Sequence, residues 1–290
     1  MQEWRTRSLS ADLHDFSGRV NSASMGRLML RLASLDFGAL LPQHVCDSDA
    51  FAVRLAGLVR FLCLKGLISS SLLEDDADMS LLASSLQHAL QFEAADLCRS
   101  FLSSFPQTNE VTRSTALCFA LSQFVFPLLG RKVRLWELGA AAGLNLNVDK
   151  YGFDCSPAWT RPAAQDSSVC VKLEFRGRLV ADPTVLPEIV ERSGCDLRPI
   201  TDDLVLRSFV FDDEPDRNRL LCAALATPRP FQVDKADAVD WLKEKVKVEE
   251  QDDDVITVVW SSMTLQYMPQ EHIPALQSLV QKRKRTIWLR

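Results

Sequence analysis

The fold of this chain is decided by one stretch, Val133-Arg134-Leu135-Trp136-Glu137-Leu138-Gly139-Ala140-Ala141-Ala142-Gly143-Leu144-Asn145. Its first six residues form a short apolar pattern typical of a buried strand. The next five are small, and Gly139 can adopt the positive φ that a sharp turn needs. A helix is expected from Leu144 to Tyr151, with free N–H groups at its start. The stretch therefore predicts a strand–turn–helix unit that lets a ligand approach the backbone.

Outward from this unit, strand and helix patterns alternate. Further strands are expected near residues 169–175, 194–197, 231–233, 254–260 and 286–289, and helices near residues 214–226, 238–246 and 270–282. Such alternation is the signature of a mostly parallel, doubly wound α/β sheet. We therefore expect a Rossmann-like α/β domain over residues 130–290.

The preceding part of the chain has a different pattern. Over residues 8–130 the apolar side chains recur every three or four positions, as in amphipathic helices. Pro106 is expected to end one helix, and Thr108 or Asn109 to cap the next, which runs to about Leu129. The sequence thus predicts a helical N-terminal cap domain over residues 1–129.

Composition excludes several classes of protein. The 290 residues carry a formal net charge of −5, so bulk nucleic-acid binding is not expected. The N-terminus lacks a signal peptide, and no apolar run reaches the length of a membrane span. The eight cysteines form no C-x-x-C pair and read as reduced, buried residues, and the four histidines lack metal-ligand spacing. We expect a cytoplasmic protein without a metal site; the sequence does not indicate an oligomeric state.

The turn after the first strand resembles one known motif. It lacks the glycines of a dinucleotide fingerprint and the Lys-Ser/Thr of a P-loop. The pattern E-x-G-x-x-x-G is similar to the first motif of class I S-adenosylmethionine-dependent methyltransferases, with Ala141 where a third glycine is usual. The resemblance implies a cofactor site that includes Glu137, Gly139, Ala141, Gly143 and Asn145. The alternative is a tight turn that binds no ligand.

Three later segments supply further candidates for that site. Asp196 ends an apolar segment and resembles the acid that bonds the ribose hydroxyls, although it follows Glu137 by 59 positions (137 to 196) rather than the usual ~20. An inserted segment that contains the 169–175 strand is expected to explain the excess. Asp237 resembles the residue that bonds the adenine amino group; as alternatives, Asp196 is a turn residue and Asp237 a helix N-cap. Ser261 and Ser262 follow a strand and are expected to face the ligand.

A polar block precedes the helix that leads to the sheet. It reads Gln107-Thr108-Asn109-Glu110-Val111-Thr112-Arg113. Capping explains Thr108 or Asn109, and a glutamate in the first turn suits the helix dipole. Capping does not need Gln107 or Arg113. We therefore regard Gln107, Asn109, Glu110 and Arg113 as candidate catalytic residues, with Glu110 as a base or substrate-orienting carboxylate.

The blocks together resemble a family of unknown function found mainly in bacteria. The family motifs Q-T-N-E-V-x-R and E-L-G-A-S-A-G-L-N-L match residues 107–113 and 137–146, with Ala141 where serine is usual. Weaker matches lie at residues 192–200, 236–238 and 262–269, so the resemblance covers about residues 25–290. It supports Asp196 and the polar block as motif residues. Family members continue past the last strand seen here, which implies a sheet truncated at its C-terminal edge.

The leading hypothesis is an S-adenosylmethionine-dependent methyltransferase that acts on a small-molecule or unknown acceptor. Methyl transfer needs the acceptor held in line with the sulfonium methyl group, with water excluded. Two alternatives stay open. One is another enzyme that uses an adenosine nucleotide, and the other is a non-catalytic binding protein that kept the fold.

Overall fold

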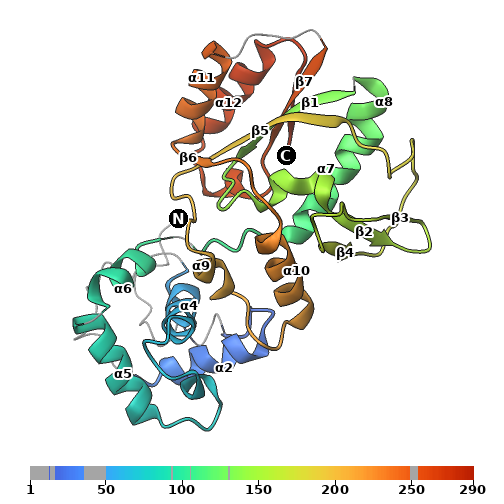
Figure 1. Ribbon diagram of the computed structural model, residues 1–290. Coiled ribbons are helices and arrows are strands. Elements are labelled where there is room, and N and C mark those ends of the chain that lie inside the picture. Colours follow the sequence, from blue (N-terminus) through green and yellow to red (C-terminus); the bar gives the residue numbers. More distant parts are fainter. Residues whose placement is uncertain are drawn as a thin grey trace. The chain divides into compact units, whose positions relative to one another are not determined.

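A computed structural model describes residue 13 and residues 17–35, 50–92, 94–104, 106–129, 131–248 and 254–290. The chain forms two compact units (Figure 1). One comprises Met1–Thr108 and Asp202–Asn218, and the other comprises Asn109–Thr201 and Arg219–Arg290.

A five-stranded parallel sheet forms the centre of the second unit, in the order β6-β5-β1-β7-β8. The strands are β1 (Lys132–Leu138), β5 (Glu188–Asp196), β6 (Val233–Lys235), β7 (Val255–Trp260) and β8 (Thr286–Leu289). This confirms the α/β class and the parallel sheet expected from the alternating pattern. Because the strands are parallel, the segments that follow β1, β5, β6 and β7 all leave the same edge of the sheet.

Helices cover both faces of this sheet. On one face lie α11 (Ala238–Val248) and α12 (His272–Gln281), which pack against Trp136, Leu138 and Val259. Figure 1 shows α7 (Ser114–Ala120) and α8 (Phe126–Leu128) on the opposite side, joined by the π-helical turn η3 (Leu121–Val125). The residues of β1 from Leu135 to Leu138 are therefore buried on both faces, which explains their nearly continuous apolar pattern.

The segment between β1 and β5 accounts for the long separation of Glu137 and Asp196. It contains η4 (Leu144–Lys150) and a second sheet of order β3-β2-β4, built from β2 (Gly152–Cys155), β3 (Trp159–Arg161) and β4 (Cys170–Lys172). The expected insertion with its own strand is thus confirmed. The helix expected from Leu144 to Tyr151 is a short 3₁₀ segment instead, because Asn147 leaves helical geometry (φ −92°, ψ 20°).

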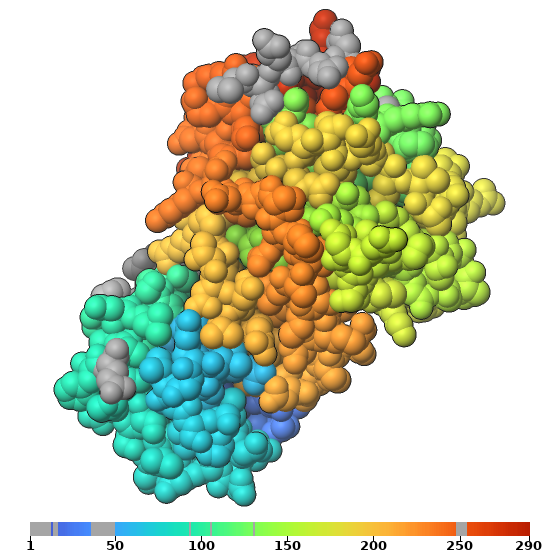
Figure 2. Space-filling model, in the orientation of Figure 1, coloured from blue at the N-terminus to red at the C-terminus, as the bar shows by residue number. Residues whose placement is uncertain are grey.

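The first unit is helical in its described residues, as the apolar spacing predicts. It contains α2 (Ala23–Leu32), α4 (Phe51–Leu64), the 3₁₀ turn η1 (Ser70–Leu73), α5 (Met79–Gln91), α6 (Ala95–Leu102) and α9 (Asp203–Arg207). The Ser22 and Asp78 side chains cap α2 and α5. In Figure 2 the golden residues that follow β5 lie against the blue and teal residues of α4 and α6. The unit is therefore built from two separate stretches of chain.

The boundary between the units differs from the expected one at residue 129. Residues 111–128 belong with the sheet, where Leu117, Leu121 and Val125 are fully buried. Residues 202–218 belong with the helices, because Phe209 and Phe211 enter the helical core. Helix α10 (Pro215–Ala226) then leads back to the second unit. A helical pattern alone does not reveal which core a helix joins.

The helical run Val111–Leu128 is long and apolar enough to cross a membrane by length and composition, with a mean hydropathy of 1.2. The sequence prediction, by contrast, is that no apolar run reaches the length of a membrane span. A single run of this kind is a weak indication, since buried helices of globular proteins pass the same test, and 44% of it is buried. It is divided into 3₁₀, α and π segments beside the sheet, as in a globular α/β protein.

The packing of Gly57 in α4 generates a stability prediction. A Cβ at this position would lie 2.5 Å from Cε1 of the buried Phe209 ring. Helix propensity alone favours alanine over glycine by about 1 kcal/mol. We expect Gly57→Ala to lower the free energy of unfolding by about 1–3 kcal/mol, because overpacking outweighs propensity.

Urea denaturation measures this change. Gly18→Ala is the matched control, because a Cβ there meets nothing within 4 Å. A stabilised Gly57→Ala variant would show that Phe209 does not pack on α4.

Candidate functional site

The bend after β1 and Asp196 lie together at the carboxyl edge of the sheet. The N–H groups of Gly139 and Ala140 both donate to the Cys195 carbonyl, at 2.8 and 3.0 Å. The Ala141 N–H donates to Asp196 Oδ2 at 3.0 Å, and Asp196 Oδ1 accepts from Arg198 N–H at 2.9 Å. Asp196 therefore contacts the bend directly, and its carboxylate fixes the backbone there.

The bend needs residues that tolerate left-handed backbone geometry. Gly139 and Gly143 have φ values of 72° and 73°, and Ala141 has a φ of 52°. A side chain in this region costs roughly 1–2 kcal/mol, which glycine avoids. Ala141 is thus held in place by its surroundings: its N–H bonds to Asp196, and its carbonyl accepts from Ile200 N–H at 3.1 Å.

Asn109 has a role that the sequence did not predict. It lies in the left-handed region (φ 39°), and its Oδ1 accepts hydrogen bonds from the N–H groups of Ala142 (3.2 Å) and Leu144 (3.1 Å). The expectation that Thr108 or Asn109 caps its own helix is wrong. Glu110 occupies that N-cap position, without a side-chain cap. Asn109 instead caps the segment that begins at Leu144, so the N–H groups expected to be free for a ligand are occupied.

Glu137 and Asn145 form the buried polar centre of this edge. Both are 2% exposed, and the Asn145 side chain hydrogen-bonds the Glu137 carboxyl. Glu137 Oε2 and Asn145 Oδ1 have no hydrogen-bond partner within the described part of the chain. Burial raises the pKa of Glu137 to about 8; the bond to Asn145 lowers it, the charge of Asp196 raises it, and that of Arg113 lowers it. A carboxyl with a raised pKa and two buried oxygens without partners therefore lie beside the bend.

The remaining residues of the polar block are divided between the units. Gln107 belongs to the first unit, whereas Glu110 and Arg113 belong to the second. Glu110 is half-buried, and its Oε1 accepts from the Thr112 hydroxyl at 3.2 Å. Arg113 lies close enough to Glu137 for its charge to lower the pKa of that carboxyl. Of this block, Asn109 is thus linked to the bend, and Arg113 acts on Glu137 beside it.

Asp237 acts as a helix N-cap. Its Oδ1 accepts from the N–H groups of Val239 (2.8 Å) and Asp240 (3.3 Å) at the start of α11. Its Oδ2 lies 3.7 Å from Nδ1 of His272. Asp237 therefore has the N-cap role that the sequence offered as an alternative. The N–H of the preceding residue, Ala236, donates to the Asp196 carbonyl at 3.0 Å, so Asp237 and Asp196 lie at the same edge of the sheet.

The two serines after β7 differ in position. Ser261 is fully buried, and its hydroxyl accepts from Trp288 Nε1 at 2.9 Å. It therefore supports the packing of β8, contrary to the expectation that it faces a ligand. Ser262 is half-buried at the strand end.

Two side chains that the sequence did not single out cover the bend. Thr264, in η5 (Thr264–Tyr267), occupies the space that a Cβ at Gly139 would need, and its hydroxyl donates to the Leu138 carbonyl at 2.9 Å. Phe231 lies over Gly143, with its Cε2 2.7 Å from the position of an added Cβ. The glycines thus provide space for side chains of the protein itself, and a ligand at Gly139 requires Thr264 to move.

The fold and the site define the class as an α/β protein with a polar site at the carboxyl edge of a parallel sheet. Residues 15–289 match a family described as uncharacterised proteins conserved in bacteria (DUF2332), and the chain belongs to that family. This confirms the family resemblance drawn from the motifs. No curated protein and no solved structure matches the chain.

The role of Asn109 leads to a second stability prediction. Asn109→Ala leaves the N–H groups of Ala142 and Leu144 without their acceptor. We expect the free energy of unfolding to fall by about 1–3 kcal/mol, the cost of unsatisfied buried donors. Asn109→Asp keeps an acceptor oxygen and should lose less. Chemical denaturation of both variants compares them; equal stability of Asn109→Ala and the wild type would contradict the role.

The raised pKa of Glu137 predicts a pH-dependent effect. The folded state holds the proton that the unfolded carboxyl releases near its ordinary pKa of 4.5, so this group makes folding less favourable as pH rises from about 4.5 to about 8. Glu137→Gln should therefore gain stability over the wild type across this window, by on the order of 4 kcal/mol.

Denaturation at pH 5, 7 and 9 tests this prediction. Glu244→Gln is the control, because Glu244 lies on the surface of α11 in an ion pair with Lys247. A stability difference between Glu137→Gln and the wild type that does not change with pH would contradict the raised pKa.

Proposed function

We propose that the second unit binds S-adenosylmethionine and transfers its methyl group to an acceptor. The strand order supports a Rossmann-like sheet: the parallel strands, numbered along the chain, run 3-2-1-4-5, as in doubly wound nucleotide-binding folds. Ligands of such sheets bind at the carboxyl edge where the order reverses. Here the order reverses between β1 and β7, beside Glu137 and the Gly139 bend.

The hydrogen-bonding state of the bend carries the proposal. Every backbone N–H from Gly139 to Leu144 already has an acceptor within the protein. The bend therefore offers no donors to a phosphate, which argues against a nucleotide bound by its phosphate groups. The unsatisfied groups are Asn145 Oδ1, which is an acceptor, and Glu137 Oε2, which becomes an acceptor when the carboxyl ionises. They fit a ligand group that donates hydrogen bonds and carries positive charge, as the ammonium group of S-adenosylmethionine does.

The other candidate residues take the following roles in this proposal. Gly139, Ala141 and Gly143 shape the bend, and the remaining lone pairs of Asp196 accept from the ribose hydroxyls. Asp237, which follows β6, lies on the adenine side, and Ser262, which follows β7, faces the ligand from the other side of β1. Glu110 accepts the proton that the acceptor loses, and Arg113 orients the acceptor. Asn109 supports the bend.

One observation favours a second candidate function, a non-catalytic protein that keeps the fold without a cofactor. Thr264 covers Gly139, and Phe231 covers Gly143. The two proposals differ in whether Thr264 gives way. The Thr264→Ala variant removes the side chain that covers Gly139. If this variant binds the cofactor, the site is present but closed by Thr264; if it does not, there is no cofactor site.

Cofactor binding should release a proton. At pH 7 Glu137 is mostly protonated, since burial raises its pKa to about 8. A ligand ammonium group against Glu137 favours the ionised carboxylate, so binding should release up to one proton. We expect isothermal titration with S-adenosylhomocysteine to give heats that depend on the ionisation enthalpy of the buffer.

The variants sharpen this test. Glu137→Gln should bind about 10-fold or more weakly, the loss of a charge-assisted hydrogen bond, and without proton release. Glu244→Gln should behave as the wild type. If neither the wild type nor Thr264→Ala binds S-adenosylmethionine or S-adenosylhomocysteine, the methyltransferase proposal fails and the non-catalytic one stands.

A further inference from the structure

A separate pocket lies between helix α7 and the small sheet, within the second unit. It is an open pocket of about 340 Å³, a volume within the usual range for small-molecule sites. The helical segment contributes Thr112, Thr115, Ala116 and Phe119. The opposite wall comes from the inserted segment between β1 and β5, which none of the roles assigned above uses.

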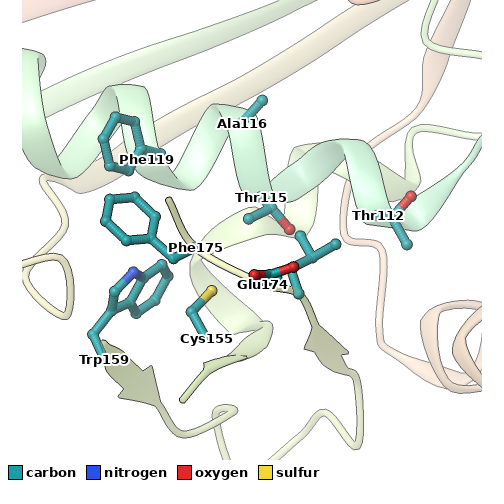
Figure 3. Close-up of a pocket in the computed structure, with 9 residues that line it drawn as sticks. Thr112, Thr115, Ala116, Phe119, Cys155, Trp159, Glu174 and Phe175 are labelled. Carbon is teal, nitrogen blue, oxygen red and sulfur yellow. The ribbon is translucent and has the colours of Figure 1, made fainter. Parts of the chain in front are cut away.

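Aromatic rings from both walls gather at one end of this pocket. Figure 3 shows Phe119 on the helix and Phe175 and Trp159 on the inserted segment, and the centroids of the Phe119 and Phe175 rings are 5.6 Å apart. Ala116 and Leu173 add further apolar surface. Walls of this kind bind a flat, apolar body by stacking and burial.

Two buried polar atoms of the pocket residues are unsatisfied. Trp159 is 8% exposed, and neither its Nε1 nor the Oγ1 of Thr115 has a hydrogen-bond partner among the described residues. A buried N–H or hydroxyl without a partner costs about 1–3 kcal/mol. The indole nitrogen only donates, so a ligand that satisfies it must carry an acceptor.

Two further residues of the pocket, Glu174 and Cys155, determine its charge and its reactivity. Glu174 faces Thr115 across the pocket in Figure 3, and its ion pair with Arg176 joins two exposed side chains, so it is weak and open to competition. The Cys155 sulfur lies between the two sides. Burial raises the pKa of Cys155, so it is a neutral part of the wall and not a nucleophile.

We propose that this pocket binds a small, flat heteroaromatic molecule that carries a hydrogen-bond acceptor, with a cationic substituent preferred beside Glu174. The rings supply the surface for stacking, Trp159 donates to the acceptor, and the Thr115 hydroxyl completes the polar contacts. The proposal does not depend on methyl transfer, because it uses no residue of the Glu137 site.

The first experiment compares ligands of equal shape. Quinoline carries an acceptor nitrogen that naphthalene lacks, and titration followed by ¹H–¹⁵N NMR observes the indole N–H signals directly. We expect quinoline to bind about 10-fold more tightly than naphthalene, the effect of one satisfied buried donor. The indole signal that Trp159→Phe removes should move on binding. Equal binding of both compounds, no binding of either, or movement of other indole signals alone would overturn the proposal.

The second experiment tests charge. 4-(Aminomethyl)quinoline should bind more tightly than quinoline-4-carboxylate, by about 3-fold or more, given the exposure of the carboxylate. Glu174→Gln should abolish this difference. A preference for the carboxylate compound, or a difference that survives Glu174→Gln, would contradict the cationic preference.

The third experiment separates a binding role from a structural one. Thr115→Val removes a hydroxyl without a partner, so the melting temperature should stay the same or rise while quinoline affinity falls. Thr160→Val, an exposed position on β3, is the matched control and should leave the affinity unchanged. A Thr115→Val variant that melts lower but binds quinoline like the wild type would show that the hydroxyl serves the fold alone.

Discussion

The bend from Gly139 to Leu144 is buried, and each of its backbone N–H groups needs an acceptor inside the protein. Three groups outside the bend supply acceptors for five of these six N–H groups. The Cys195 carbonyl of the neighbouring strand takes two, the Asp196 carboxylate takes one, and the Asn109 amide takes two. The sixth, of Gly143, bonds within the bend to Ala140 at 2.7 Å. Segments far apart in the sequence are thereby tied to the end of β1.

This arrangement determines the kind of chemistry that the sheet edge supports. A bend with free N–H groups attracts anions, and nucleotide-binding folds use such bends for phosphates. Here every backbone N–H of the bend already has an acceptor, while one carboxyl oxygen of Glu137 and the amide oxygen of Asn145 lack partners. A phosphate site attracts negative charge, whereas these oxygens suit a ligand group that carries positive charge. The charge of Arg113 lowers the pKa of Glu137 but does not cancel the rise caused by burial. A positively charged ligand group beside Glu137 would therefore favour the ionised carboxylate.

Part of this could be predicted from the sequence. The apolar period of β1 and the acid–glycine pattern identified the strand, the bend and Glu137, because both depend on neighbouring residues. Asp196 was found through its motif, and the structure places it against Ala141. The role of Asn109 was missed, since its side chain satisfies residues 33 and 35 positions away, which no local capping rule includes. Thr264 and Phe231 were missed for the same reason. The burial of Ser261 depends on Trp288, whose position follows only from the strand order.

The division of the chain has a consequence for synthesis on the ribosome. The helical core formed by residues up to Thr108 takes in Phe209 and Phe211, which are translated just over 100 residues later (108 to 209). The nascent helices therefore wait for their last apolar side chains until β1 and β5 have emerged. The helical core therefore receives its last side chains after β1 and β5 have been made, while β6, β7 and β8 of the parallel sheet are still to be synthesised.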